Sequence, residues 1–299
     1  MKRLPLLVLI SWLLIGFSAA LAEDRLVPLE SAAHSTASLQ PGLESYQATV
    51  VTDRIAAMIQ SSTASMPADM PRPEVPTVVK YWRRGAPRSA IVASGAQASP
   101  FMQQMVQRIS ANLAIEPDEL VLPPDKGAER RRLAEQATVK NTETTVADNV
   151  MQRVELLFAV PADLGEAFYG NGLRLPQNGI SKLQFDIDAK TRTVRELVVQ
   201  SAAGDQLLAE FRYRPVRSGL LAERVRVTSP DGKVDDRLEV TFAEVAGYLL
   251  PDKIVRVLNR PGLQDHLEVA FTDYRINQPF PAEIEAQLAT PAAPAMKTP

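Results

Sequence analysis

The stretch KLQFDIDAKTRTVRELVVQ, residues 182–200, decides the fold class. Its first part, residues 182–188, alternates polar and apolar side chains with a period of two, which is typical of a strand that buries one face. Residues 188–191 form a short turn signal, and a second apolar run follows at residues 193–200. Because a short connection joins antiparallel neighbours, the stretch predicts two antiparallel strands that share an apolar face.

The same pattern continues to residue 276 and predicts a larger sheet. Alternation recurs at residues 207–214, 223–229, 237–242 and 266–271, with a less regular run at residues 253–258. The connections between these runs are short and contain Gly, Pro, Asp or Asn, which are turn residues. We therefore predict about seven antiparallel strands between residues 180 and 276.

The first half of the chain predicts further strands and a helix. Strand-like runs occupy residues 46–58, 76–92 and 150–160. Ser99 and Pro100 suit the N-cap and the first position of a helix. The apolar stripe that follows at helical spacing consists of Phe101, Met102, Met105, Ile109 and Leu113. This pattern predicts an amphipathic helix. We assign no role to the charged, insertion-like region at residues 123–149.

A sheet with one apolar face must cover that face, and a large twisted sheet tends to curl. The predicted fold class is α+β: a curved antiparallel β-sheet forming an unclosed half-barrel, with α-helices covering the concave apolar face. Because one or two helices would not fill that face, we expect an apolar ligand cavity. Its candidate residues are Phe101, Met102, Met105 and Ile109 of the helix and Phe185, Phe211, Val225, Val240 and Val269 of the strands. For any single one of them, plain core packing is the alternative.

The N-terminus has the order of a secretory signal peptide. A basic start, Lys2-Arg3, precedes an apolar run, and Ala20-Leu21-Ala22 precedes the charged Glu23. The alternative is an uncleaved anchor, but the apolar run is shorter than the roughly 20 residues that a bilayer requires. The predicted divisions are a signal peptide at residues 1–22, a flexible segment at residues 23–42, one half-barrel domain at residues 43–285 and a disordered tail at residues 286–299.

Composition narrows the class of protein further. The 299 residues contain no cysteine, which excludes a disulfide scaffold, a cysteine nucleophile and lipid attachment at cysteine. The net charge of −2 and the lack of basic blocks argue against a nucleic-acid partner. With export through a signal peptide, these features favour a monomer in a bacterial periplasm.

The sequence offers no catalytic constellation. It has two histidines, and we expect both His34 and His266 to be solvated surface residues. No G-x-S-x-G motif occurs, and no acidic pair has the spacing of a metal site. We therefore expect a protein that is not an enzyme, with no catalytic residue, no metal and no cofactor.

Two stretches carry a resemblance to a known family. FTDYRINQPFPAEIE, residues 271–285, resembles the C-terminal segment of periplasmic outer-membrane lipoprotein-sorting carriers, the LolA/LolB-like superfamily. FDIDAKTRTVRELVVQSAAGDQLLAEFRY, residues 185–213, is similar to the strand–turn–strand units of that family. The resemblance covers residues 180–285 and is only architectural over residues 44–160.

The resemblance implies an unclosed barrel with a helical lid and a cavity for acyl chains of lipids or lipoproteins. It also implies partners in the inner- and outer-membrane lipoprotein machinery. Arg84 and Arg88 are candidates for the family's lid-locking arginine, with ordinary solvated arginines as the alternative. Asn277–Pro281 is expected to be a stiff strap that carries Phe280 back against the sheet. The alternative function is a periplasmic sensor or interaction module on the same fold, like the regulators that bind an anti-sigma factor.

Overall fold

The structure is a computed structural model that describes residues 25–35, 40–64, 74–86, 89–94, 106, 115–116, 119–146, 148–216 and 219–289. The chain falls into two compact units. Unit 1 comprises residues 1–39 and 118–235, and unit 2 comprises residues 40–117 and 236–299.

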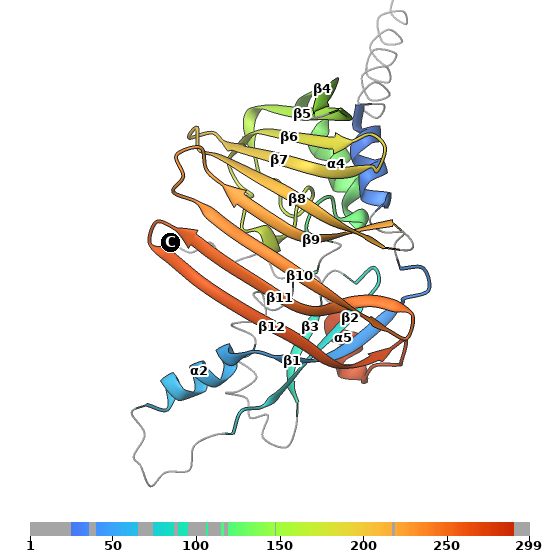
Figure 1. The fold of residues 1–299 in the computed structure, drawn as a ribbon, viewed down its shortest axis with the longest axis vertical. Helices are drawn as coiled ribbons and strands as arrows, with labels where there is room; N and C mark the ends of the chain where they lie inside the picture. The colour runs from blue at the N-terminus through green and yellow to red at the C-terminus, as the bar shows by residue number, and fades with distance from the viewer. Residues whose placement is uncertain are drawn as a thin grey trace, which may run out of the picture. The chain divides into compact units, whose positions relative to one another are not determined.

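Unit 1 contains an open antiparallel arrangement of strands that follow one another in chain order (Figure 1). The strands are β4 (Ala137–Val146), β5 (Asn149–Ala162), β6 (Ile180–Asp188), β7 (Thr193–Ser201), β8 (Gln206–Val216) and β9 (Gly219–Thr228). Its helical elements are residues 25–35, η1 (Pro124–Lys126), α4 (Gly127–Ala134) and η2 (Asn171–Leu173).

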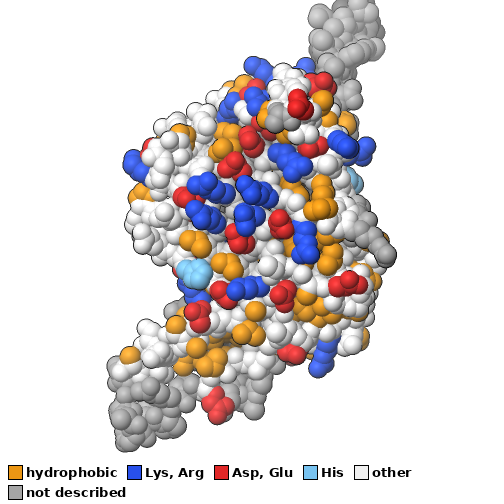
Figure 2. Space-filling view, viewed as in Figure 1, with side chains coloured by type: hydrophobic (Ala, Val, Ile, Leu, Met, Phe, Trp, Pro, Cys, Tyr) orange, Lys and Arg blue, Asp and Glu red, His pale blue; other side chains and the backbone are white. Residues whose placement is uncertain are grey.

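The alternation in the sequence explains the two faces of this sheet. Phe185, Leu197 and Ala209 are register partners on β6, β7 and β8, and each is fully buried. The residues between them point the other way, where Arg226 and Glu210 form an exposed cross-strand pair. Figure 2 shows basic and acidic side chains interspersed over β7–β9, as expected for a solvated face.

Unit 2 brings the two ends of the chain into one sheet. Its strand order is β10-β11-β12-β1-β2-β3, so β12 pairs with β1, which lies more than 200 residues earlier. The strands are β10 (Asp235–Val245), β11 (Tyr248–Arg260), β12 (Leu263–Ile276), β1 (Ser45–Val51), β2 (Thr77–Arg83) and β3 (Ala90–Ser94). Its helices are α2 (Asp53–Ser62) and α5 (Ala282–Ala289).

The predicted fold class is confirmed, since both units are open antiparallel sheets accompanied by helices. The strands expected between residues 180 and 276 are β6 to β12. The predicted amphipathic helix at residues 99–114 lies outside the described residues except for Val106, which is helical and buried. Among the described residues, no helix combines the length and apolarity needed to span a bilayer.

Three sequence expectations need correction. The segment at residues 23–42, expected to be flexible, contains the helix of residues 25–35, which buries Leu26, Leu29 and Ala33. The tail expected to be disordered from residue 286 begins inside α5, whose Ile284 and Leu288 are buried. The run at residues 46–58 is a strand only to Val51, because Thr52 caps α2 by accepting a hydrogen bond from the backbone N–H of Arg54. In all three places, tertiary packing or a cap decides the local structure.

Candidate functional site

The predicted cavity residues lie in different parts of the molecule. Phe185, Phe211 and Val225 are buried in unit 1, and Val240 and Val269 are buried in unit 2. Phe101, Met102, Met105 and Ile109 lie outside the described residues. The two units are therefore considered separately as candidate sites.

In unit 1 the apolar face is closed by the chain's own aromatic side chains. Phe168 packs on Phe185 with ring centroids 5.9 Å apart, and both rings are fully buried. Tyr169, in the same loop, donates a hydrogen bond to the carbonyl of Pro176, and burial raises its pKa well above the usual range. Phe185 therefore belongs to a filled core at this point.

A buried ion pair joins the helical parts of unit 1. The guanidinium of Arg130 on α4 is fully buried and donates to both carboxylate oxygens of Glu30, at 2.9 and 3.0 Å. It also donates to the carbonyls of Pro123 and Ala167, at 2.6 and 3.0 Å. Each hydrogen bond satisfies a group that burial would otherwise leave unpaired, so Arg130 holds the helix of residues 25–35 against α4 and two loops.

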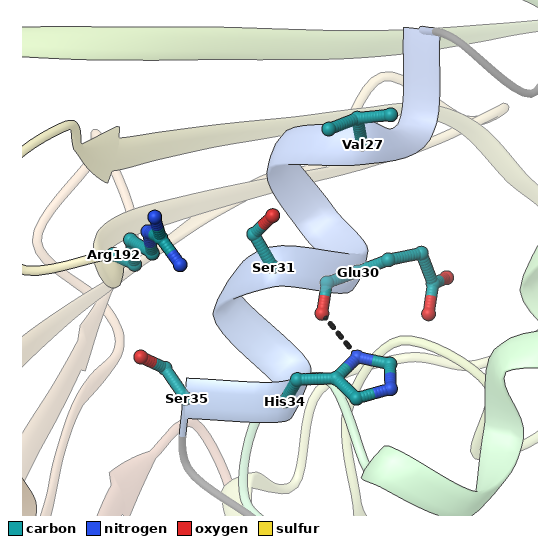
Figure 3. A pocket seen from close by; sticks show the side chains of 6 residues that line it. All are labelled: Val27, Glu30, Ser31, His34, Ser35 and Arg192. Atoms are coloured by element: carbon teal, nitrogen blue, oxygen red, sulfur yellow. Dashed lines mark hydrogen bonds between the residues drawn. The ribbon is translucent and has the colours of Figure 1, made fainter.

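A surface hollow of about 380 Å³ opens beside Glu30 and is drawn in Figure 3. Its lining residues are Val27, Glu30, Ser31, His34, Ser35 and Arg192. The Nδ1 of His34 donates to the backbone carbonyl of Glu30 at 2.7 Å, so this ring is engaged by its own helix. The hollow is open to solvent and mixed in polarity.

Unit 2 has a sheet face of different composition, which we call the inner face of unit 2. Cross-strand register puts its residues on one side of the sheet. They are Tyr46, Ala48, Val50, Val78, Lys80, Trp82, Leu238, Val240, Ile254, Arg256, Leu267, Val269 and Phe271, all of them buried. Most of this face is apolar, but it includes a lysine and an arginine.

Lys80 on β2 is fully buried and forms an ion pair within this apolar face. Its Nζ lies 2.7 Å from Oε1 of Glu116 and donates to the carbonyl of Ile115 at 3.5 Å. Tyr46 donates to Oε2 of Glu116 at 3.2 Å, and Ser89 donates to Oε1. Lys80 and Glu116, with these neighbours, hold residues 115 and 116 against the inner face of unit 2.

Aromatic rings surround this ion pair. The Nζ of Lys80 lies 5.2 Å from the ring centroid of Phe271, within the range of a cation–π contact. Tyr46 stacks on Trp82 at 5.2 Å and meets Tyr274 edge to face at 5.5 Å. Burial, reinforced by the negative charges of Glu116 and Asp252, raises the pKa of Tyr274 above its usual range, so its hydroxyl stays protonated and donates to the carbonyl of Pro251.

The structure describes one of the two candidate lid-locking arginines, Arg84. Arg84 donates from Nε to the carbonyl of Leu43 at 2.9 Å and from Nη2 to the carbonyl of Gln40 at 2.7 Å, so it fixes the loop before β1. Arg88 lies outside the described residues. Among the described residues of this region, Lys80 is the cation that contacts residues 115 and 116. A signal for it exists in the sequence, because period-two alternation along TVVKYWR places Lys80 on the same face as Val78 and Trp82.

The strap residues end β12 and turn the chain onto the opposite face of β2. The side-chain oxygen of Asn277, which has φ +52°, accepts hydrogen bonds from the backbone N–H groups of Glu44 and Ser45 at 2.8 and 3.1 Å. Phe280 is buried and packs edge to face on Tyr81, with centroids 5.2 Å apart. Arg83 lies over the ring of Phe280 and forms an ion pair with Glu285 of α5. Phe280 therefore supports the sheet from the side away from Lys80.

Comparisons with known proteins concern the fold. No family model matches the chain, and no curated protein matches it. The structure is similar to a domain assigned to outer membrane lipoprotein sorting in Vibrio parahaemolyticus, with 7% identity and a TM-score of 0.34 over 87% of this chain and 98% of that one. It is also similar to a LolA superfamily protein of Nitrosomonas europaea, with 10% identity and a TM-score of 0.33 over 85% and 95% of the two chains. The superfamily named by the sequence resemblance is thus among the matches.

A third match is the MucA/MucB complex of Pseudomonas aeruginosa, with 11% identity and a TM-score of 0.19 over 90% of this chain and 96% of that one. Identities this low identify no binding residue in this chain. The functional proposal therefore rests on the residues described above.

Proposed function

We propose that the protein is a periplasmic binding or carrier protein for acyl chains of lipids or lipoproteins, and that the inner face of unit 2 is its binding surface. The observation that carries this proposal is the buried Lys80–Glu116 ion pair within that apolar face. A role in outer-membrane lipoprotein sorting, with partners in the two membranes, is the cellular setting in which such a carrier would act.

The physical argument concerns how residues 115 and 116 are attached. Burying an ion pair gains little net stability, because the loss of hydration offsets most of the attraction. When the pair separates into water, both charges recover their hydration, so this attachment is specific in position yet reversible. A permanent core contact is made more simply by apolar packing. A polar attachment is what a binding surface needs if residues 115 and 116 must move when ligand enters.

The apolar part of the face suits a hydrocarbon chain. Val50, Val78 and Val269 are buried, β-branched residues of this face. Burial of apolar surface is favourable and non-directional, at about 25 cal/mol per Å². A site of this kind therefore binds acyl chains of varied length, which is the behaviour expected of a carrier.

Binding of a fluorescent fatty-acyl probe to delipidated protein tests the proposal. Wild type should take up the probe saturably. The double variant Lys80→Met/Glu116→Gln, which removes both charges together, should bind with faster association and dissociation, because the attachment of residues 115 and 116 is weakened. The matched control is Lys140→Met at an exposed position of β4, which should behave as wild type.

Absence of saturable uptake by the folded wild type would contradict the carrier proposal. In that case the sensor or interaction module remains, and a protein ligand would be sought.

A further inference from the structure

A cluster of charged side chains occupies one end of the inner face of unit 2. It lies where β10 begins, β11 ends and β12 begins, and α2 contributes one residue. The members of this arginine cluster are Arg54, Asp236, Arg256, Arg260 and Asp265. None of them belongs to the Lys80–Glu116 pair, which lies toward the other end of β12, next to Phe271.

The ion pairs within the arginine cluster differ in length. Asp236 accepts from Nε of Arg260 at 2.6 Å and from the backbone N–H of Asn259 at 2.9 Å, and Nη2 of Arg260 lies 2.5 Å from it. Asp265 pairs closely with Arg54, whereas Nη2 of Arg256 lies 3.9 Å from the carboxylate of Asp265. The arginine cluster therefore joins three arginines and two aspartates at this end of the sheet.

Burial differs across the cluster in a way that suits a ligand group at the rim of a site. Arg256 is only 3% exposed, and register places it in one row with Leu238 and Leu267. The side chains of Arg54 and Arg260 are 35% and 22% exposed. The cluster therefore runs from solvent, at Arg54 and Arg260, to the apolar interior at Arg256.

The neighbouring rows of the same face are apolar. Val240, Ile254 and Val269 form the next row, and Phe271 follows on β12. From Asp265 to Phe271 the strand advances by about 20 Å, at roughly 3.4 Å per residue. The charged end at Asp265 and the apolar side chains that follow it on the same face of β12, Leu267, Val269 and Phe271, match the two parts of a single-chain amphiphile.

We propose that the arginine cluster binds the anionic group of an amphiphilic ligand, a carboxylate or phosphate, whose hydrocarbon chain lies along β12 over Leu267, Val269 and Phe271. Arginine fits this role because its planar fork of donors matches both oxyanions and remains charged when buried. The inference deepens the proposed function and rests on it, since it assigns the chemical class of the ligand to the same face. A structural network that binds nothing is the competing account.

Displacement of a neutral fluorescent acyl probe separates the two accounts. Myristate and methyl myristate have the same hydrocarbon chain and differ in charge. For wild type, we expect myristate to displace the probe at a concentration at least tenfold lower than the methyl ester. In Arg256→Met this preference should fall to threefold or less, while displacement by the ester stays within twofold of wild type.

Two further variants guard against a folding defect. Arg54→Gln changes a partly exposed residue and should also lower the preference for myristate. Arg212→Gln, an exposed arginine of β8 in unit 1, is the matched control and should leave the preference unchanged. If Arg256→Met does not fold, a lowered preference in Arg54→Gln alone supports the proposal, and an unchanged preference overturns it.

The outcomes also distinguish failure of this inference from failure of the proposed function. Equal displacement by acid and ester in a wild type that binds the neutral probe overturns the inference and leaves the carrier function standing. Absence of probe binding overturns both. A further measurement adds inorganic phosphate at the same concentration as myristate. If phosphate abolishes the preference for myristate over its ester, the cluster is a site for a free anion, and the assignment to an amphiphile is overturned.

Discussion

The two units use their buried charges in different places. In unit 1 the sheet face at Phe185 is packed by Phe168. Its buried charges lie elsewhere: Arg130 pairs with Glu30 between helices and loops, and Asp186 and Asp188 lie on the opposite side of β6, paired with arginines. In unit 2 the buried charges of Lys80 and Arg256 lie on the sheet face itself. Since a charge in an apolar row is unfavourable unless it has a partner, its presence needs a reason beyond stability. The difference makes the inner face of unit 2 the better candidate for binding.

The largest expected effect is a loss of stability when the Arg130–Glu30 pair of unit 1 is broken. Arg130→Met removes four hydrogen bonds and leaves Glu30 and two carbonyls without their donor. We expect the free energy of unfolding to fall by about 3–5 kcal/mol, the usual range for breaking a buried ion pair. Chemical denaturation of this variant measures the loss. Arg131→Met, one residue along the same helix and exposed, is the control and should change stability by about 0.5 kcal/mol or less. A small loss for Arg130→Met would mean that the pair does not hold unit 1 together.

The second prediction concerns the ion pair of unit 2. Lys80→Met leaves the carboxylate of Glu116 buried without its cation and should reduce stability by about 3 kcal/mol. Adding Glu116→Gln should restore most of this loss, because Tyr46 and Ser89 can donate to the amide oxygen. Denaturant unfolding of both single variants and the double variant forms a double-mutant cycle. Additive losses would show that the two side chains do not act as a pair.

A smaller effect is expected from the strap on the other face of β2. Phe280→Ala removes a buried ring that packs on Tyr81 and should cost about 1–3 kcal/mol, somewhat less than a fully enclosed core Phe. Thermal or chemical unfolding gives the value. Leu263→Ala, at a half-exposed position of β12, is the apolar control and should be close to neutral. Loss of acyl-probe binding in Phe280→Ala at full stability would contradict a purely supporting role.

The smallest effect is a pH dependence of the attachment of α5. The hydrogen bond from Arg83 lowers the pKa of Glu285 below its ordinary value of 4.5, and the positive charge of Arg83 acts in the same direction. A carboxylate with a lowered pKa stabilises the folded state above its ordinary pKa, and this contribution disappears as the pH falls through the lowered value. The melting temperature of wild type should therefore be slightly higher than that of Glu285→Gln at neutral pH. Well below pH 4.5 the two melting temperatures should be equal. A difference that persists in acid would contradict this assignment.

The local sequence pattern was sufficient to predict the strands from residue 180 onward. Period-two alternation and short turns from residue 180 onward correspond to β6 to β12, because strands with one buried face must alternate. The helix of residues 25–35 was missed although Leu26, Leu29 and Ala33 recur at helical spacing, because the segment is short; it is held in place by Arg130, about 100 residues later. Local reading cannot supply a contact of that separation.

The candidate site was only partly accessible from sequence. Lys80 could have been found, since alternation along β2 places it on the apolar side. Its partner Glu116 lies in a segment without periodicity, and nothing local connects the two residues. The pairing of Arg54 with Asp265 spans 211 residues and depends on β12 lying beside β1. Charges that meet through a closing strand pair of this kind become visible only in the folded structure.

Removal of the predicted signal peptide would leave the mature protein with a single tryptophan. The chain contains two tryptophans, Trp12 in the predicted signal peptide and Trp82 on the inner face of unit 2. Cleavage after residue 22, which N-terminal sequencing of the exported protein would verify, leaves Trp82 as the single tryptophan. Its fluorescence then reports on one known position of the proposed binding surface.

The most direct test is quenching of Trp82 fluorescence by a fatty acid brominated along its chain, in delipidated mature protein. Bromine quenches only at close contact, so a chain that extends along the inner face of unit 2 as far as Trp82 should quench its fluorescence saturably, whereas the same unbrominated fatty acid should not. Equilibrium dialysis of the brominated ligand gives an independent measure of binding. Binding without quenching would show that the bound chain ends short of Trp82, and the absence of both would contradict acyl-chain binding by this protein.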